Sequence, residues 1–104
     1  MIIITGRVIV ADENREAFLE LANTQITNSL TEPGCLGYAC HEDIRERGAF
    51  LFVERWRDPE AVAIHFAKDY CLAFMEGAKK VTLGDTQIEI HHVSNTDVRA
   101  VSKT

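Results

Sequence analysis

The chain has 104 residues, of which 46% are hydrophobic and 26% charged, and its formal net charge is −5. This length fits one domain of ordinary size and leaves no room for two cores. The acidic balance argues against non-specific binding to nucleic acid, which requires clustered Lys and Arg, and no stretch approaches the roughly 20 apolar residues of a membrane helix. The sequence contains three cysteines, no CxxC pair and no basic leader, which predicts reduced thiols in a cytoplasmic protein.

The chain begins with a predicted strand followed by a predicted helix. Residues 2–10 are rich in Ile and Val, which favour extended structure. A helical stripe of apolar residues then runs through residues 13–31. Asp12 is a suitable N-cap, and Pro33-Gly34 ends the pattern. We therefore expect the first strand to lead directly into a helix of about five turns.

Two further strands are predicted to form a hairpin. They cover residues 35–43 and 49–57, and the charged connection between them ends in Gly48, as hairpin loops often do. Side chains alternate between the two faces of a strand. One face of the second strand therefore carries Phe50, Phe52, Glu54 and Trp56.

The residue pattern in the second half of the chain predicts two helical pieces and a last strand. Asp58-Pro59 is a strong helix start, and that helix continues to about Phe66. A second piece, without a clean apolar stripe, runs over residues 70–80. Gly84-Asp85 reads as a turn, and residues 86–93 alternate as the fourth strand.

This order of elements, βαββαβ, is that of a ferredoxin-like α+β fold. Such a fold has one antiparallel four-stranded sheet with its helices on one face. We expect a domain over residues 1–94, followed by a polar tail at 95–104 that is loose or lies over a partner. The second sheet face would be bare in a monomer, and a second copy of the chain would cover it most simply.

Three motifs, taken in chain order, resemble those of the antibiotic biosynthesis monooxygenase superfamily, and the resemblance extends over roughly residues 2–93. They are Glu32-Pro33-Gly34-Cys35-Leu36-Gly37-Tyr38, then Glu54-Arg55-Trp56-Arg57-Asp58, then a helix that carries His65. The resemblance implies a homodimer in which two sheets pack face to face as a dimeric α/β barrel. It also implies a pocket between sheet and helices in each subunit. Members include cofactor-free monooxygenases of phenolic or quinol-like compounds, haem-degrading enzymes and an isomerase, so the fold alone does not select an activity.

Glu54, Trp56 and His65 are the candidate site residues with a definable chemistry. A hydrogen bond from Glu54 would orient the His65 imidazole and raise its basicity, so that His65 could remove a phenolic proton as the catalytic base. The resulting electron-rich anion can react with O2 without flavin or metal. Trp56 would form an apolar wall that stacks on the substrate ring. The simpler reading keeps Trp56 in the core, ties Glu54 to the backbone or to an Arg, and makes His65 a satisfied structural histidine.

Other residues are expected to bind substrate. Tyr38 and Tyr70 could each donate a hydrogen bond to a bound carbonyl, and the aromatic rings of Phe52 and Phe66 are expected to line the pocket. The pair His91-His92 does not predict a metal site, because adjacent strand residues face opposite ways.

No cofactor is expected. The haem-degrading branch uses an iron-binding His, an Asn and a Trp, and this chain aligns Met75, the Thr5-Gly6 region and His65 with those positions. The resemblance, together with these candidate residues, therefore implies a cofactor-independent monooxygenase acting on a small aromatic or quinol-like compound with O2. An isomerase of a small keto compound using the same His-based pocket and a non-catalytic dimeric binding module are the alternatives.

Overall fold

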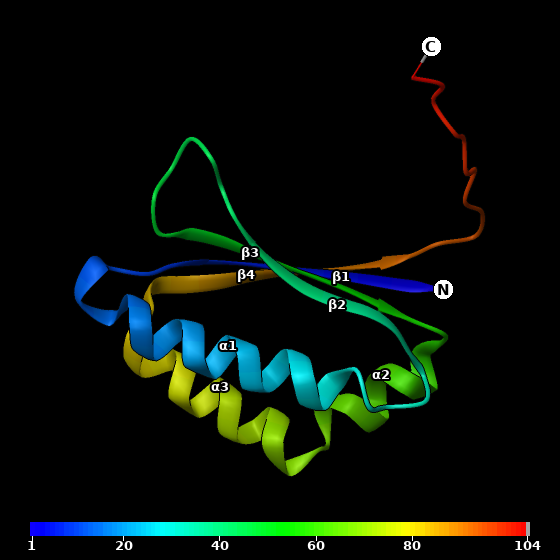
Figure 1. The fold of residues 1–104 in the computed structure, drawn as a ribbon. Coiled ribbons are helices and arrows are strands. Elements are labelled where there is room, and N and C mark those ends of the chain that lie inside the picture. Colours follow the sequence, from blue (N-terminus) through cyan, green and yellow to red (C-terminus); the bar gives the residue numbers. More distant parts are fainter. Residues whose placement is uncertain (104) are drawn as a thin grey trace.

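One antiparallel sheet forms the centre of the molecule, and the helices of the described residues cover one of its faces (Figure 1). The computed structural model describes residues 1–103. The strands, in the order β2-β3-β1-β4, are β1 (Ile2–Ile9), β2 (Cys35–Glu42), β3 (Ala49–Trp56) and β4 (Leu83–His92). The α-helices are α1 (Arg15–Ser29), α2 (Pro59–Phe66) and α3 (Asp69–Val81). The predicted ferredoxin-like α+β fold is confirmed.

The two central strands carry the core on the side that faces the helices. Alternate residues of β1 and β3 are buried there, because the period of two directs them all to one face. Across the sheet, Tyr38 pairs with Glu54, Glu54 with Ile4, and Ile4 with Ile90. This row places the Tyr38 phenol beside the Glu54 carboxylate under the helices.

Two local predictions need correction, and a third is confirmed. A short 3-10 turn over Asp12–Asn14 precedes α1, and Asp12 forms an ion pair with Arg47 in place of a side-chain cap. The helical piece predicted over residues 70–80 is confirmed, as a regular helix of 13 residues. Gly84 does not form a turn but lies inside β4, where its φ of 67° accompanies a register shift opposite β1. A left-handed residue of this kind is typical of a β-bulge, and only glycine adopts it without strain.

The sheet face opposite the helices is open. The connection between β2 and β3 and the tail after β4 both leave the sheet on that side (Figure 1). The tail has no regular structure over residues 93–103, and Thr104, its last predicted residue, lies outside the described residues. Within residues 1–103, no helix has both the length and the apolar character needed to cross a membrane.

Candidate functional site

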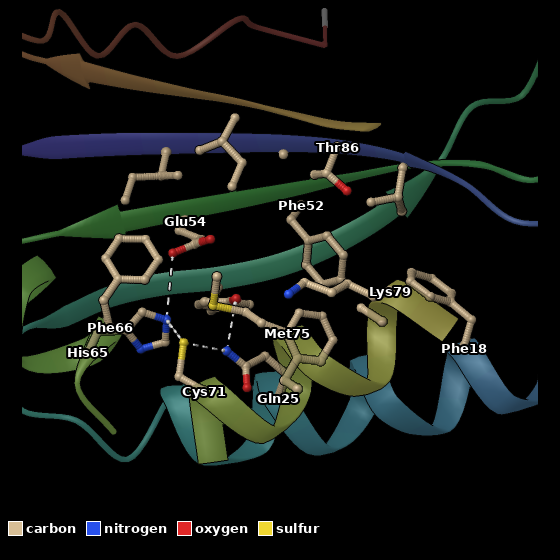
Figure 2. Close-up of a pocket in the computed structure, with 17 residues that line it drawn as sticks. Phe18, Gln25, Phe52, Glu54, His65, Phe66, Cys71, Met75, Lys79 and Thr86 are labelled. Carbon is tan, nitrogen blue, oxygen red and sulfur yellow. Dashed lines mark hydrogen bonds and ion pairs between the residues drawn. The ribbon is translucent and has the colours of Figure 1, made fainter. Parts of the chain in front are cut away.

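A cavity of about 190 Å³ lies between the sheet and the helices (Figure 2). Its walls are mainly aromatic and aliphatic, and four of the lining residues are phenylalanines: Phe18, Phe52, Phe66 and Phe74. Polar groups gather at one end of the cavity, namely Gln25, Tyr38, Glu54, His65 and Cys71. Lys79 and Thr86 lie toward the other end. An apolar chamber with a few convergent polar groups is the usual form of a small-molecule site.

His65 reaches this cavity because the start of α2 is tightly determined. The Asp58 side chain accepts a hydrogen bond from the Ala61 backbone N–H at 2.8 Å, and Pro59 occupies the first turn. His65 then falls in the last turn with 1% of its surface exposed. Its ring packs against the Trp56 indole, with the ring centroids 4.4 Å apart and the ring planes tilted by 37°. The imidazole is therefore held between the floor of the sheet and the helix that carries it.

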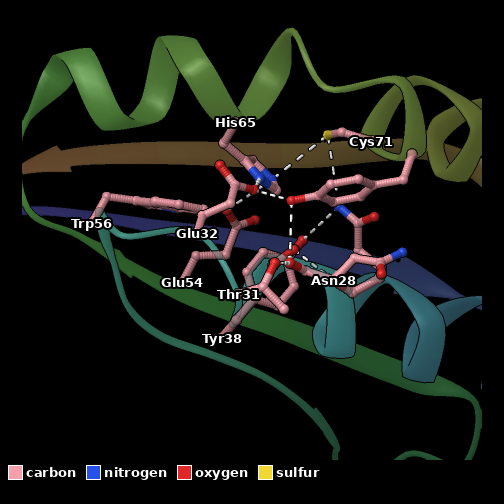
Figure 3. Close-up of polar contacts among 11 residues, drawn as sticks. Asn28, Thr31, Glu32, Tyr38, Glu54, Trp56, His65 and Cys71 are labelled. Carbon is pink, nitrogen blue, oxygen red and sulfur yellow. Dashed lines mark hydrogen bonds and ion pairs between the residues drawn. The ribbon is translucent and has the colours of Figure 1, made fainter.

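Glu32, not Glu54, orients the imidazole. His65 Nδ1 lies 2.7 Å from Glu32 Oε2 (Figure 3). An ionised carboxylate can only accept hydrogen bonds, so Nδ1 carries the proton and Nε2 is left with a lone pair when the ring is neutral. The second nitrogen lies on the cavity side, 3.6 Å from Cys71 Sγ. This is the arrangement of a histidine prepared to accept a proton.

The loop after α1 brings Glu32 to this position. The turn is closed by backbone hydrogen bonds from Glu32 N–H to Ser29 and from Cys35 N–H to Glu32. A side chain at Gly34 would place its Cβ 2.4 Å from that of Ala61, so only glycine allows α2 to pack so closely. The Tyr70 hydroxyl donates to the same carboxylate oxygen, Glu32 Oε2. The Glu-Pro-Gly motif was the available signal for Glu32, but its role depends on contacts between distant segments.

Glu54 has a different partner from the predicted one. Its Oε1 accepts a hydrogen bond from the Trp56 indole N–H at 2.9 Å and lies 3.9 Å from His65 Nε2, too far for a hydrogen bond. The predicted Glu54–His65 hydrogen bond is therefore wrong. Burial raises the pKa of Glu54, while the indole hydrogen bond and the nearby His65 oppose that rise.

Two of the five predicted substrate-binding residues do not line the cavity. Trp56 is 0% exposed and lies behind His65, so the expected stacking wall is a structural support instead. Tyr70 is engaged with Glu32 and with the backbone carbonyl of Asn28. The structure brings Tyr38, Phe52 and Phe66 together in the cavity wall. Burial raises the pKa of Tyr38, as does the nearby Glu54 carboxylate, so its hydroxyl stays protonated.

The structure adds two polar residues that the sequence analysis missed. Gln25 from α1 and Cys71 from α3 meet at the polar end of the cavity, with Gln25 Nε2 3.6 Å from Cys71 Sγ and 3.4 Å from the Tyr38 hydroxyl. Both side chains come from faces where α1 and α3 approach the sheet. No motif marks them, because only the packing of two helices that are far apart in sequence makes them neighbours.

Comparisons of the sequence and of the fold with known proteins point to the same family. The model of the antibiotic biosynthesis monooxygenase family matches residues 1–77. "Uncharacterized protein sll1783" of Synechocystis is 34% identical over 95 residues, which cover 91% of this chain and 65% of that protein's length. "Putative monooxygenase YcnE" of Bacillus subtilis is 28% identical over 81 residues, covering 78% of this chain and 85% of that protein. A crystal structure named as a "putative antibiotic biosynthesis monooxygenase" from Deinococcus radiodurans is similar in fold, with a TM-score of 0.90 at 23% identity over 96% of this chain and 99% of that one.

Proposed function

Because the chain belongs to the antibiotic biosynthesis monooxygenase family, we propose that it oxidises a small aromatic or quinol-like compound with O2, without flavin or metal. One observation carries the proposal. The His65 imidazole is fixed through Nδ1 by Glu32 at 2.7 Å, while Nε2 is directed to an apolar cavity. A base held in one orientation and shielded from water is what removal of a phenolic proton requires.

The cavity suits a substrate built on one substituted ring. Its volume of about 190 Å³ compares with an engineered cavity of about 150 Å³ that binds benzene. Aromatic walls favour a flat ring in offset or edge contacts. The polar groups at one end support a position of the ring in which the reacting hydroxyl lies beside His65 and Tyr38.

The reaction assigns a separate task to each polar group. His65 Nε2 takes the proton from a ring hydroxyl, and Glu54 at 3.9 Å stabilises the imidazolium that forms. The Tyr38 hydroxyl donates a hydrogen bond to the substrate oxyanion. The electron-rich anion then passes electrons to O2. One oxygen atom enters the ring and the other leaves as water, and the substrate supplies all four electrons.

Oxygen consumption tests this proposal directly. The protein is mixed with a panel of dihydroxyaromatic compounds in an oxygen-electrode cell, and products are analysed after turnover with isotopically labelled O2. We expect one labelled oxygen atom per product and one O2 consumed. Turnover that continues without O2 would instead indicate an isomerase. Saturable ligand binding without any product would indicate a binding module, and either result would contradict the monooxygenase.

The homodimer is also a proposal, and the open sheet face supports it. Ile3, Thr5, Ala39 and Val53 lie there as neighbours on adjacent strands, partly buried but without a covering layer. Arg55 and Glu89 share this face, as the direct partners of Ile3 and Thr5, so the patch is apolar at its centre and charged around it. A sheet face with such an apolar centre is normally covered. A second copy placed by two-fold symmetry would cover both faces at once, which is why we propose the dimeric barrel.

Val53→Asp is expected to convert this dimer into a monomer. The new carboxylate would be desolvated in the interface without a partner, and we expect the dissociation constant to rise at least about 100-fold, or roughly 2.7 kcal/mol. Light scattering coupled to size exclusion measures the mass. Leu72→Asp, at an exposed position of α3 on the other side of the sheet, is the matched control and should leave the mass unchanged. A wild type that is already monomeric at micromolar concentration would contradict the proposal.

A further inference from the structure

Cys71 lies in the cavity wall in line with a carboxylate and an imidazole. The residue is 2% exposed, and its sulfur is 3.6 Å from His65 Nε2. Glu32 binds the opposite nitrogen of the same ring at 2.7 Å. The carboxylate therefore orients the imidazole, and the imidazole lies next to the thiol, which is the arrangement of a nucleophile activated by a neighbouring base. The proposed oxidation makes no use of this thiol.

We propose that Cys71 is a covalent modification site for electrophilic ring compounds of the quinone class that enter the cavity. This inference goes beyond the proposed oxidation and does not depend on it, because the modification needs neither O2 nor turnover. Where the oxidation does occur, its quinone product is generated beside the thiol, so the same step would limit the life of the enzyme.

A second observation points to a ligand at this place. Gln25 is 2% exposed and lines the cavity, and its amide lies against Cys71 and Tyr38 (Figure 2). Among the described residues, Gln25 Oε1 has no hydrogen-bond partner although it is buried. Buried polar atoms are nearly always paired, because leaving one unpaired costs free energy. Nε2 is the atom of this amide that faces Cys71 and Tyr38, whereas Oε1 points toward the helices (Figure 2). A half-turn of the amide would bring Oε1 to the cavity, where a ring hydroxyl of a bound ligand or adduct would satisfy it.

The covalent step balances without any further reagent. Cys71 Sγ adds to a ring carbon of the quinone as the S–H proton passes through His65 Nε2 to a quinone oxygen. The hydrogen on the attacked carbon then leaves as a proton and is taken up at the other oxygen. A C–S bond has formed, the S–H bond has broken, and the ring has become a thioether-substituted hydroquinone. The adduct mass is the sum of protein and quinone.

The surroundings of Cys71 suppress the thiolate at rest. Burial raises the pKa of the Cys71 thiol, and the carboxylates of Glu54 and Glu32 raise it further, while the hydrogen bond from Gln25 opposes the rise. The thiol therefore reacts only when His65 takes its proton at the moment of attack. This makes the modification selective for compounds that fit the cavity.

The chain contains two internal comparators. Cys35 and Cys40 are partly exposed and lie outside the cavity wall, so simple accessibility predicts that they react before Cys71. We expect the opposite with p-benzoquinone under anaerobic conditions at neutral pH, with Cys71 modified at least tenfold faster than Cys40. A bulky charged disulfide reagent, which does not fit the cavity, should label Cys35 and Cys40 first. Mass spectrometry of peptides from brief exposures gives the rate at each thiol.

His65→Gln then tests the role of the base. We expect the rate at Cys71 to fall at least tenfold, while the rates at Cys35 and Cys40 stay unchanged. A Cys71 rate in wild type no faster than that of Cys40, or one that His65→Gln leaves unaltered, would overturn the proposal. Because the assay contains no O2, its failure is separate from the failure of the proposed oxidation, which oxygen uptake measures alone.

Discussion

Replacing His65 by glutamine is expected to lower kcat for oxygen uptake by about 100- to 10,000-fold, the usual contribution of a positioned general base. Glutamine is close to histidine in reach and can still donate to Glu32, but it cannot take up a proton. KM should change little, because the aromatic walls that hold the ring are left intact.

The control for this experiment is His92→Gln on β4. His92 is exposed and takes no part in the cavity wall, so its variant should keep the wild-type kcat. Circular dichroism and thermal unfolding of both variants show that the comparison concerns folded protein. If folded His65→Gln retains kcat within a few-fold of wild type, His65 is not the base, and the proton must go elsewhere.

Local pattern was enough to predict the architecture of this chain. Alternation in β1 and β3 requires one buried face, and Asp58 with Pro59 specifies where α2 begins. The same two rules place Glu54, Trp56 and His65 on the covered side of the sheet before any contact is known. The bulge at Gly84 was missed because Gly-Asp is equally compatible with a turn.

Local pattern could not predict which side chains of the site bind to one another. Glu32 and His65 are 33 residues apart and meet only because the loop at Gly34 passes close to α2. Strand spacing puts Glu54 and Trp56 on one face, and the indole N–H then takes the carboxylate oxygen that had been assigned to His65. A sequence pattern gives the face on which a side chain lies, but the choice among several acceptors on that face depends on distances of a few ångström.

Trp56→Ala is expected to reduce the free energy of unfolding by about 3–5 kcal/mol, as large-to-small changes at fully buried aromatic sites do. Trp56 has no exposed surface, and its ring contacts those of Tyr38 and His65. The cavity left behind would remove the support of the His65 ring, so kcat should also fall. Urea denaturation followed by circular dichroism gives the stability change.

Trp56→Phe separates the packing of this residue from its hydrogen bond to Glu54. Phenylalanine retains most of the ring contacts but has no N–H. The indole hydrogen bond lowers the pKa of Glu54, although burial, whose effect is larger, raises it. Without the indole hydrogen bond the pKa of folded Glu54 should rise further above its ordinary value of 4.5.

A carboxyl whose pKa is higher in the folded state stabilises the fold below the unfolded pKa and loses that contribution as the pH rises through the folded pKa. The cost of Trp56→Phe should therefore be larger at pH 7 than at about pH 4, and an equal cost at both would mean that the indole does not stabilise the Glu54 carboxylate.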